Sequence, residues 1–507
     1  MARRFRALAL PAGVVVVALL LLPAAGAAPG ATFRVSVASG GGQSDGRSSV
    51  PTISADDRYS AFHSDASNLV PGDTNFAKDV FVHDRSSNQT ERVSIAESGA
   101  EGNADSFSPA VNADGRFVAF YSSASNLVDG DGNGVNDVFV RDRQDRSTVR
   151  VSLAPGGASP NGGSSSPSIS ADGRFIAFLS DASNLVAGDT NRLRDAFVFD
   201  RQTGTTTRAS VDDVGTEANL DSFTPVLSAD GRFVVFTSFA FNLVADDINE
   251  GSDVFVRDLQ AQTMTRVSVY EGGFEAEGDS LRPAISADGR IVAFDSDAWN
   301  LAWGDTNDVF DVFVHDRETG VTTRVSVDDS GTQADGPSVR PALSADGRYV
   351  AFYTEASNLV PGDTNGASDV LIYDRQSGAE KRVSVAGGGV EANGDSLRPA
   401  LSADGRVVVF ESNASNLVSG DSNGFTDVFL HDRNRSTTPR AVVRCRVPRV
   451  IGLRLAVART RIGRANCRVG RVRRARSRRV GKVLGQSPRA GAVRPRGTKV
   501  NLTVGRR

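Results

Sequence analysis

The sequence is poor in the residues from which metal and nucleophile sites are usually built. Its 507 residues include two Cys, two Met, two Trp and four His. The four histidines share no cluster spacing, and the motif H-E-x-x-H does not occur; G-x-S-x-G occurs at 42–46 and 420–424, in turn-rich segments that do not follow an apolar strand. These features argue against a zinc peptidase, and the roughly 70 residues outside the repeats are too few for a separate α/β-hydrolase domain. We therefore predict that the chain is not an enzyme.

Long apolar runs are absent after residue 31. Before that point, three arginines between residues 3 and 6 precede an apolar stretch at 14–22 and the small residues Ala25-Gly26-Ala27. This order is typical of a secretory signal peptide, which we assign to residues 1–31. The sequence therefore predicts an exported protein, extracellular or associated with the cell wall. An uncleaved anchor helix is the alternative.

Acidic residues are absent from the C-terminal part of the chain. Residues 440–507 contain 22 Lys or Arg and no Asp or Glu, although the whole chain has a net charge of −3. Subtracting these 22 and the three signal arginines from the total of 57 leaves 32 basic residues against 60 acidic ones. The part between is therefore near −28, and the contrast predicts two domains of opposite charge, joined near residue 440.

An internal repeat dominates the sequence between these ends. "SADDR" at 54, "NADGR" at 112 and "SADGR" at 170, 228, 286, 344 and 402 recur every 58 residues, giving seven copies. Each copy has four short apolar-alternating segments separated by turn residues. This pattern predicts an all-β fold, a seven-bladed β-propeller over residues 32–439. A solenoid of stacked sheets is the alternative.

The first strand of the propeller is predicted to close the ring. Residues 32–37, "TFRVSV", match the fourth segment of the repeat, since Arg34 stands 58 residues before Arg92. We expect this N-terminal strand to complete the last blade, which would remove both exposed edges. The repeat, as in "SPSISADGRFIAF" followed by "DAFVFDRQTG", resembles the TolB-type, WD-like propeller repeat. That resemblance implies a binding platform, a periplasmic accessory protein or, rarely, an enzyme.

One loop in each copy carries the pattern D-x-N-x-x-x-D. In the second copy Asp129 precedes it, so that Asp129, Asp131, Asn133 and Asp137 stand at positions 1, 3, 5 and 9 of a loop. Oxygen ligands at this spacing suit calcium, and the loop resembles the calcium loop of integrin-type propellers. The alternative is architectural: the Asp and Asn form Asx-turns, and the last Asp caps the following strand.

Three arginines stand at one position of the repeat. The residue before the proline of the first strand is Arg282, Arg340 and Arg398 in the last three copies. First strands line the channel of a propeller, so these side chains are candidate ligands for an anion. The alternative pairs them with loop acids such as Asp279 and Asp395.

The basic segment from residue 446 contains the frame V-P-x-V-x-G-L, a helix-like segment at 454–465, and "QSPRAG". It resembles the PASTA domain, a small α+β module, which we assign to residues 440–507. The resemblance implies binding of cell-wall peptidoglycan. The charge of the segment also favours an anionic wall polymer. Docking on the acidic propeller is the alternative.

The two cysteines, Cys445 and Cys467, lie at the start of this module. An even pair in an exported protein predicts a disulfide. Together these features predict a non-enzymatic binding or scaffold protein of the bacterial envelope, held at the wall by its basic module. Another envelope protein is a further candidate partner. The alternatives are an enzyme acting on polysaccharide at the channel mouth and a calcium-stabilised spacer.

Overall fold

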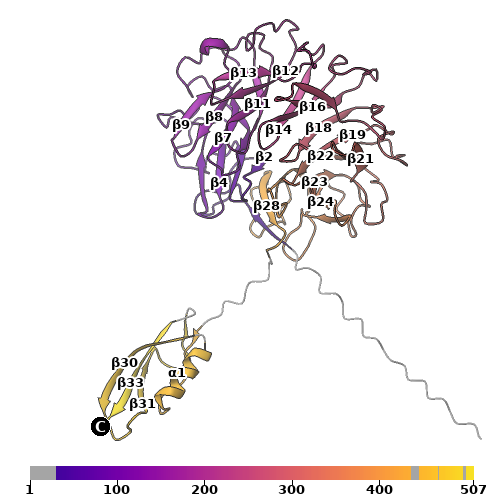
Figure 1. Ribbon diagram of the computed structural model, residues 1–507. Helices are drawn as coiled ribbons and strands as arrows, with labels where there is room; N and C mark the ends of the chain where they lie inside the picture. Colours follow the sequence, from indigo (N-terminus) through magenta and orange to yellow (C-terminus); the bar gives the residue numbers. More distant parts are fainter. Residues whose placement is uncertain (1–29, 436–444, 466, 495–497) are drawn as a thin grey trace, which may run out of the picture. The chain divides into compact units, whose positions relative to one another are not determined.

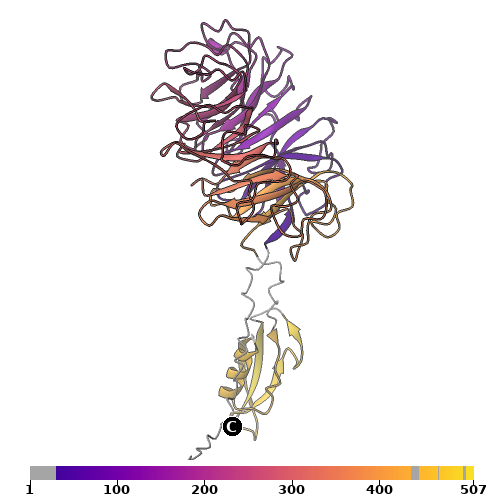
Figure 2. The same cartoon turned by 90° about the vertical axis from the view of Figure 1, so that its right-hand side faces the viewer.

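A computed structural model describes residues 30–435, 445–465, 467–494 and 498–507. The chain divides into two compact units, Met1–Arg435 and Ser436–Arg507 (Figures 1 and 2). The predicted signal peptide lies almost entirely outside the described residues, as does the predicted boundary at 439/440. None of the described helices is both long and apolar enough to cross a bilayer.

The first unit is all β. Its described residues form seven four-stranded sheets, one from each repeat, and we number them 1 to 7 in chain order. The first strands of sheets 1 to 7 are β2 (Ser48–Ile53), β6 (Ser106–Val111), β10 (Ser164–Ile169), β14 (Ser222–Leu227), β18 (Ser280–Ile285), β22 (Ser338–Leu343) and β26 (Ser396–Leu401). The second strands are β3 (Tyr59–Ser64), β7 (Phe117–Ser122), β11 (Phe175–Ser180), β15 (Phe233–Ser238), β19 (Ile291–Ser296), β23 (Tyr349–Thr354) and β27 (Val407–Ser412).

The third and fourth strands complete each sheet, and all neighbours in a sheet are antiparallel. The third strands are β4 (Asp79–Asp84), β8 (Asp137–Asp142), β12 (Asp195–Asp200), β16 (Asp253–Asp258), β20 (Asp311–Asp316), β24 (Asp369–Asp374) and β28 (Asp427–Asp432). The fourth strands of sheets 1 to 6 are β5 (Gln89–Arg92), β9 (Ser147–Arg150), β13 (Thr205–Arg208), β17 (Thr263–Arg266), β21 (Val321–Arg324) and β25 (Ala379–Arg382). A short 3-10 helix, η1 (Pro155–Gly157), follows β9.

The fourth strand of sheet 7 comes from the other end of the repeat region. β1 (Ala31–Arg34) pairs antiparallel with β28, with Ala31 opposite Asp432. The first and last sheets also meet directly, because the N–H of Ser48 donates to the carbonyl oxygen of Thr426 at 2.9 Å. β2 and β28 accordingly lie close together in Figure 1.

The core of this unit lies between neighbouring sheets. The middle strands are buried on both faces, which explains why segments such as Phe175–Ser180 read as nearly continuous apolar runs. Six sheets contain a Phe pair across these strands, such as Phe178 and Phe197, whose ring centroids lie 5.9 Å apart. Val138 of sheet 2 and Phe178 of sheet 3 belong to one buried cluster, so packing also joins each sheet to its neighbour.

Every first strand contains a bulge before its proline. The residue at the bulge has φ between 45° and 55°, a left-handed conformation that is uncommon for residues other than glycine. Pairing with the second strand shifts register at the same place, for example between Leu281 and Ala284. The bulge residues are Val50, Ser108, Ser166, Thr224, Arg282, Arg340 and Arg398.

The second unit mixes one helix with short strands. Its elements are β29 (Cys445–Arg446), α1 (Leu455–Arg464), β30 (Arg468–Arg476), β31 (Val483–Ser487), β32 (Val493–Arg494) and β33 (Lys499–Arg506). β33 pairs parallel with β30 and antiparallel with β31. Ala458 and Ile462 of α1 are buried and pack with Val500 and Leu502 of β33 in one small core.

Candidate functional site

The three predicted arginines occupy equivalent bulges in consecutive sheets. Arg282 lies on β18, Arg340 on β22 and Arg398 on β26, and these first strands are neighbours. We call the three the arginine row. The left-handed backbone and the bulge give all three the same local conformation. The repeat thus places three guanidinium groups on three adjacent strands.

Two of the three arginines are neutralised by acids of the second strands. Arg282 Nη2 lies 2.6 Å from Asp295 Oδ2, and Arg398 Nη1 lies 2.7 Å from Glu411 Oε1. Both carboxylates are nearly inaccessible to solvent. The loop acids suggested by the sequence do not take this role, because Asp279 accepts hydrogen bonds from Ser252 instead.

Arg340 differs from its two neighbours. Tyr353 stands where sheets 5 and 7 have Asp295 and Glu411, and only the backbone N–H of Arg340 reaches an acid, at 3.3 Å from Asp295 Oδ1. Among the described residues its guanidinium has no hydrogen bond or ion pair. Burial lowers the pKa of Arg340, and the charges of Arg398 and Arg282 lower it further. The row therefore carries one uncompensated positive charge.

The predicted calcium loop brings three of its four residues together. Asn133 donates from Nδ2 to Asp137 Oδ2 at 2.8 Å, and its Oδ1 accepts the N–H of Val135 at 3.2 Å in an Asx-turn. Asp131 faces the same point, whereas Asp129 is exposed and has no contact among the described residues. These contacts fit the architectural alternative.

A cationic side chain already lies between the two aspartates. Arg150 Nη1 is 3.0 Å from Asp131 Oδ1 and 3.2 Å from Asp137 Oδ2. Burial and the charge of Asp137 raise the pKa of Asp131, and the guanidinium opposes that rise. Calcium at this loop stays a prediction, and it would have to compete with Arg150 for the same oxygens.

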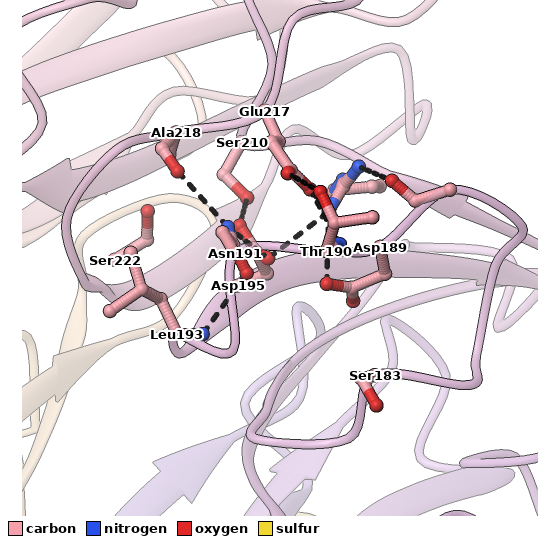
Figure 3. A network of polar contacts seen from close by, with 12 residues as sticks. Ser183, Asp189, Thr190, Asn191, Leu193, Asp195, Ser210, Glu217, Ala218 and Ser222 are labelled. Carbon is pink, nitrogen blue, oxygen red and sulfur yellow. Dashed lines mark hydrogen bonds and ion pairs between the residues drawn. The ribbon is translucent and has the colours of Figure 1, made fainter.

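The same arrangement recurs in all seven sheets. In each, an arginine of the fourth strand lies 3.0 to 3.5 Å from both aspartates of the loop, with a side chain only 6% to 9% exposed. Figure 3 shows the version in sheet 3, where Glu217 joins the cluster and Ser210 donates to Asp195. We call these clusters arginine clasps. Their arginines are Arg34, Arg92, Arg150, Arg208, Arg266, Arg324 and Arg382.

The clasps were not predicted from the sequence, although a signal was present. An arginine stands 13 residues after the last Asp of the pattern in all seven copies, but in sheet 7 the arginine that contacts the aspartates is Arg34, and Arg440 lies outside the described residues. Two of the clusters, Asp247–Asp253–Glu275 and Asp363–Asp369–Glu391, have carboxylate oxygens close enough together to hold a metal ion. Each also contains its arginine: Arg266 Nη1 lies 2.8 Å from Glu275 Oε2.

The basic unit contains the predicted disulfide and a groove. Cys445 and Cys467 are bonded across a sequence separation of 22 residues. A groove of about 850 Å³ runs beside β30 and β33. Arg471, Arg473 and Lys499 line it, and all three are exposed. Such a surface suits an anionic chain.

Comparison with known proteins identifies this unit. Residues 446–506 match the model of the PASTA domain. The basic unit is a PASTA domain. Its Gln486, part of the sequence frame, donates to the carbonyl oxygen of Pro448 at 2.9 Å and accepts the N–H of Val450 at 2.8 Å. The frame residue therefore fastens the first loop of the PASTA domain to β31.

Solved structures with a similar fold include TolB-type β-propellers. TolB from Acinetobacter baumannii is 17% identical, with a TM-score of 0.38 over 71% of this chain and 67% of that one. An oligogalacturonate lyase from Vibrio parahaemolyticus is 12% identical, with a TM-score of 0.47 over 80% of this chain and 98% of that one. An oligogalacturonate lyase in complex with manganese is 13% identical, with a TM-score of 0.46 and the same coverage. No curated protein matches the sequence.

These similarities concern the fold alone, but they correct one prediction. The absence of an H-E-x-x-H motif and of room for a separate catalytic domain led to the prediction that the chain is not an enzyme. That prediction is contradicted, because two of these structures are named as oligogalacturonate lyases, at 12% and 13% identity.

Proposed function

We propose that this chain is an exported envelope protein that binds the cell wall through its PASTA domain and an anionic ligand through its propeller. The observation that carries the proposal is the PASTA match over residues 446–506 together with the basic groove of that domain. The disulfide fits an oxidising compartment outside the cytoplasm. The wall ligand is peptidoglycan or an anionic wall polymer, and another envelope protein is a further candidate partner.

The proposal includes the organisation of the chain. Residues 1–31 are a signal peptide, residues 32–439 a closed ring of seven blades, and residues 440–507 the PASTA domain with its link. The pairing of β1 with β28 and the hydrogen bond between Ser48 and Thr426 support closure. Calcium is left out of the proposed function because Arg150 shares the oxygens of the predicted loop.

Wall binding is tested by reversing charges in the groove. The triple variant Arg471→Glu, Arg473→Glu, Lys499→Glu is compared with a control that changes the net charge equally on α1 (Arg459→Glu, Arg461→Glu, Arg464→Glu). We expect sedimentation with purified walls to be lost in the first variant and largely kept in the second. Equal loss of wall binding in both variants would show that binding depends on net charge alone and not on the groove. Acid-stripped walls lack anionic polymers, so sedimentation with them distinguishes binding to peptidoglycan from binding to an anionic polymer.

Anion binding by the propeller is tested at Arg340. A guanidinium presents a planar fork that matches a carboxylate or phosphate, whereas an ammonium group does not. We therefore expect calorimetric heat with citrate or inorganic phosphate to disappear in Arg340→Gln and to weaken in Arg340→Lys. The exposed Arg146→Gln, on sheet 2, is the control. Unchanged heats of binding in Arg340→Gln would show that the arginine row does not bind the anion.

A further inference from the structure

Exposed aromatic side chains are concentrated on two neighbouring sheets. Both tryptophans of the chain, Trp299 and Trp303, lie on one loop of sheet 5 and are 59% and 103% exposed. Phe239 and Phe241, on the matching loop of sheet 4, are 39% and 58% exposed. We call these four residues the aromatic strip. Large apolar side chains exposed together mark interaction surfaces in soluble proteins.

The repeat supplies an internal reference for these positions. Phe241 and Trp299 stand where the other five copies have serine: Ser67, Ser125, Ser183, Ser357 and Ser415. Trp303 stands where two copies have alanine, Ala187 and Ala245. The loop therefore forms without an aromatic side chain in most copies, and the fold does not require the rings. An explanation for the strip has to come from what it contacts outside the chain.

Hydrogen bonds join the two loops into one surface. The N–H of Ile248, which is itself 80% exposed, lies 3.1 Å from Glu275 Oε2. Asn300, next to Trp299, donates to the carbonyl oxygen of Glu275 at 2.9 Å and accepts the N–H of Glu277 at 2.8 Å. The segment around Glu275 thus bridges the loop that carries Phe241 and the loop that carries Trp299.

The loop segments that carry and border the strip are acidic, and Arg266, which contacts them, is buried and already paired with Asp247, Asp253 and Glu275. Segments 239–252, 270–280 and 297–311 have no Lys or Arg. Exposed carboxylates border the rings: Asp246, Glu250, Glu277, Asp297 and Asp308. An anion would be repelled here, whereas hydroxyl groups can donate to these oxygens. The ligand therefore has to be uncharged or cationic, with an apolar face.

The rings are also separate from one another. Among the described residues, Phe241, Trp299 and Trp303 make no ring–ring contact, and Phe239 contacts only Phe223. A sugar ring has an apolar C–H face and a rim of hydroxyl groups. Separate aromatic rings bordered by hydrogen-bond acceptors therefore match the successive sugar rings of a polysaccharide. A protein interface would instead favour a continuous apolar centre.

We propose that the aromatic strip binds an uncharged polysaccharide. The rings of Trp299, Trp303 and Phe241 stack on sugar rings, and the bordering carboxylates accept hydrogen bonds from hydroxyl groups. This site is distinct from the arginine row and from the PASTA groove, and it does not depend on either. It gives the chain a second class of ligand on the propeller.

Intrinsic fluorescence tests the proposal directly, because both tryptophans of the chain lie in the strip. The full chain is titrated with a β-1,4-linked N-acetylglucosamine hexamer, and with maltohexaose as a second neutral oligosaccharide. We expect a saturable blue shift of the emission with at least one of them. Trp299→Ser and Trp303→Ala, which copy the sibling loops, should each weaken binding about tenfold or more. Binding by the variants is read by calorimetry.

An exposed aromatic ring outside the aromatic strip provides a matched control. Phe76 on sheet 1 is fully exposed and stands where three copies have glycine, so Phe76→Gly removes an exposed ring without touching the strip. We expect this variant to bind like the parent. No emission change with either sugar overturns the proposal. The proposal is also overturned if the emission depends only on protein concentration and dimers appear in sedimentation. That result would assign the strip to contact between two copies of the chain.

Discussion

The arginine clasp of sheet 2 leads to a strong prediction for the substitution Arg150→Gln. The guanidinium is nearly buried and lies 3.0 Å from Asp131 and 3.2 Å from Asp137, and its Nη2 donates to Ser159 Oγ at 3.1 Å. Glutamine keeps much of the length and a hydrogen-bond donor but removes the charge. The substitution therefore isolates the electrostatic part of the clasp.

The expected loss follows from the burial of Asp137. This carboxylate has no exposed surface, and without Arg150 it retains only hydrogen bonds from Ser152 and Asn133. Removing one partner of a buried ion pair costs about 3–5 kcal/mol, since the remaining charge is left uncompensated. We expect a decrease of this size in the free energy of unfolding of the first unit.

Urea denaturation followed by circular dichroism measures the effect. Arg146→Gln, an exposed change in the same sheet, is the control and should lie within about 0.5 kcal/mol of the parent. If Arg150→Gln is no less stable than Arg146→Gln, the reasoning about the clasp is refuted.

The pH dependence gives a second readout of the same variant. Burial and the charge of Asp137 raise the pKa of Asp131, so the folded state favours its protonated form. Stability that comes from a raised carboxyl pKa is present at low pH and is lost as the pH rises through the folded value. The deficit of Arg150→Gln should therefore grow between pH 5 and pH 7. If the loop binds calcium, millimolar calcium should restore this variant at pH 7. No restoration would dismiss the predicted metal site.

Three further outcomes are expected. Burial lowers the pKa of His431 to about 4, so its contribution is present above about pH 6.5 and is lost as the pH falls toward 4. Denaturation of His431→Gln should therefore depend less on pH in that window. Phe197→Ala should cost about 3–5 kcal/mol in urea titrations, because its fully buried ring packs on Phe178, and a loss below 1 kcal/mol would contradict the packing described here. Cys445→Ser should lower the stability of the PASTA domain by about 3 kcal/mol, read by its melting with and without reductant, since the bond to Cys467 spans a sequence separation of 22 residues.

The repeat made the fold accessible from sequence. Alternation and turn residues, recurring every 58 positions, gave the strands, and the offset between Arg34 and Arg92 gave the pairing of β1. The PASTA domain was recognisable because its frame residues have structural roles, as Gln486 does. Such features lie within one repeat or one short segment.

Contacts that depend on side-chain direction were harder to predict. D-x-N-x-x-x-D reads as a metal loop because its oxygens are visible in sequence, whereas the guanidinium that meets them comes from a strand 13 residues later. Likewise, the sequence pointed to loop acids as partners of Arg282 and Arg398. Their partners are Asp295 and Glu411, which lie across a strand pair rather than on the loops.

The pairing of β1 with β28 has a consequence for synthesis. Ala31 is opposite Asp432, so 432 − 31 = 401 residues separate them along the chain. At ribosomal rates of about 5–20 residues per second, β1 waits roughly 20–80 s for its partner. During that time it is an unpaired strand, able to pair with any other open edge. Short as it is, with four residues, β1 offers such an edge few hydrogen bonds. The shortness of β1 thus limits mispairing in the nascent chain.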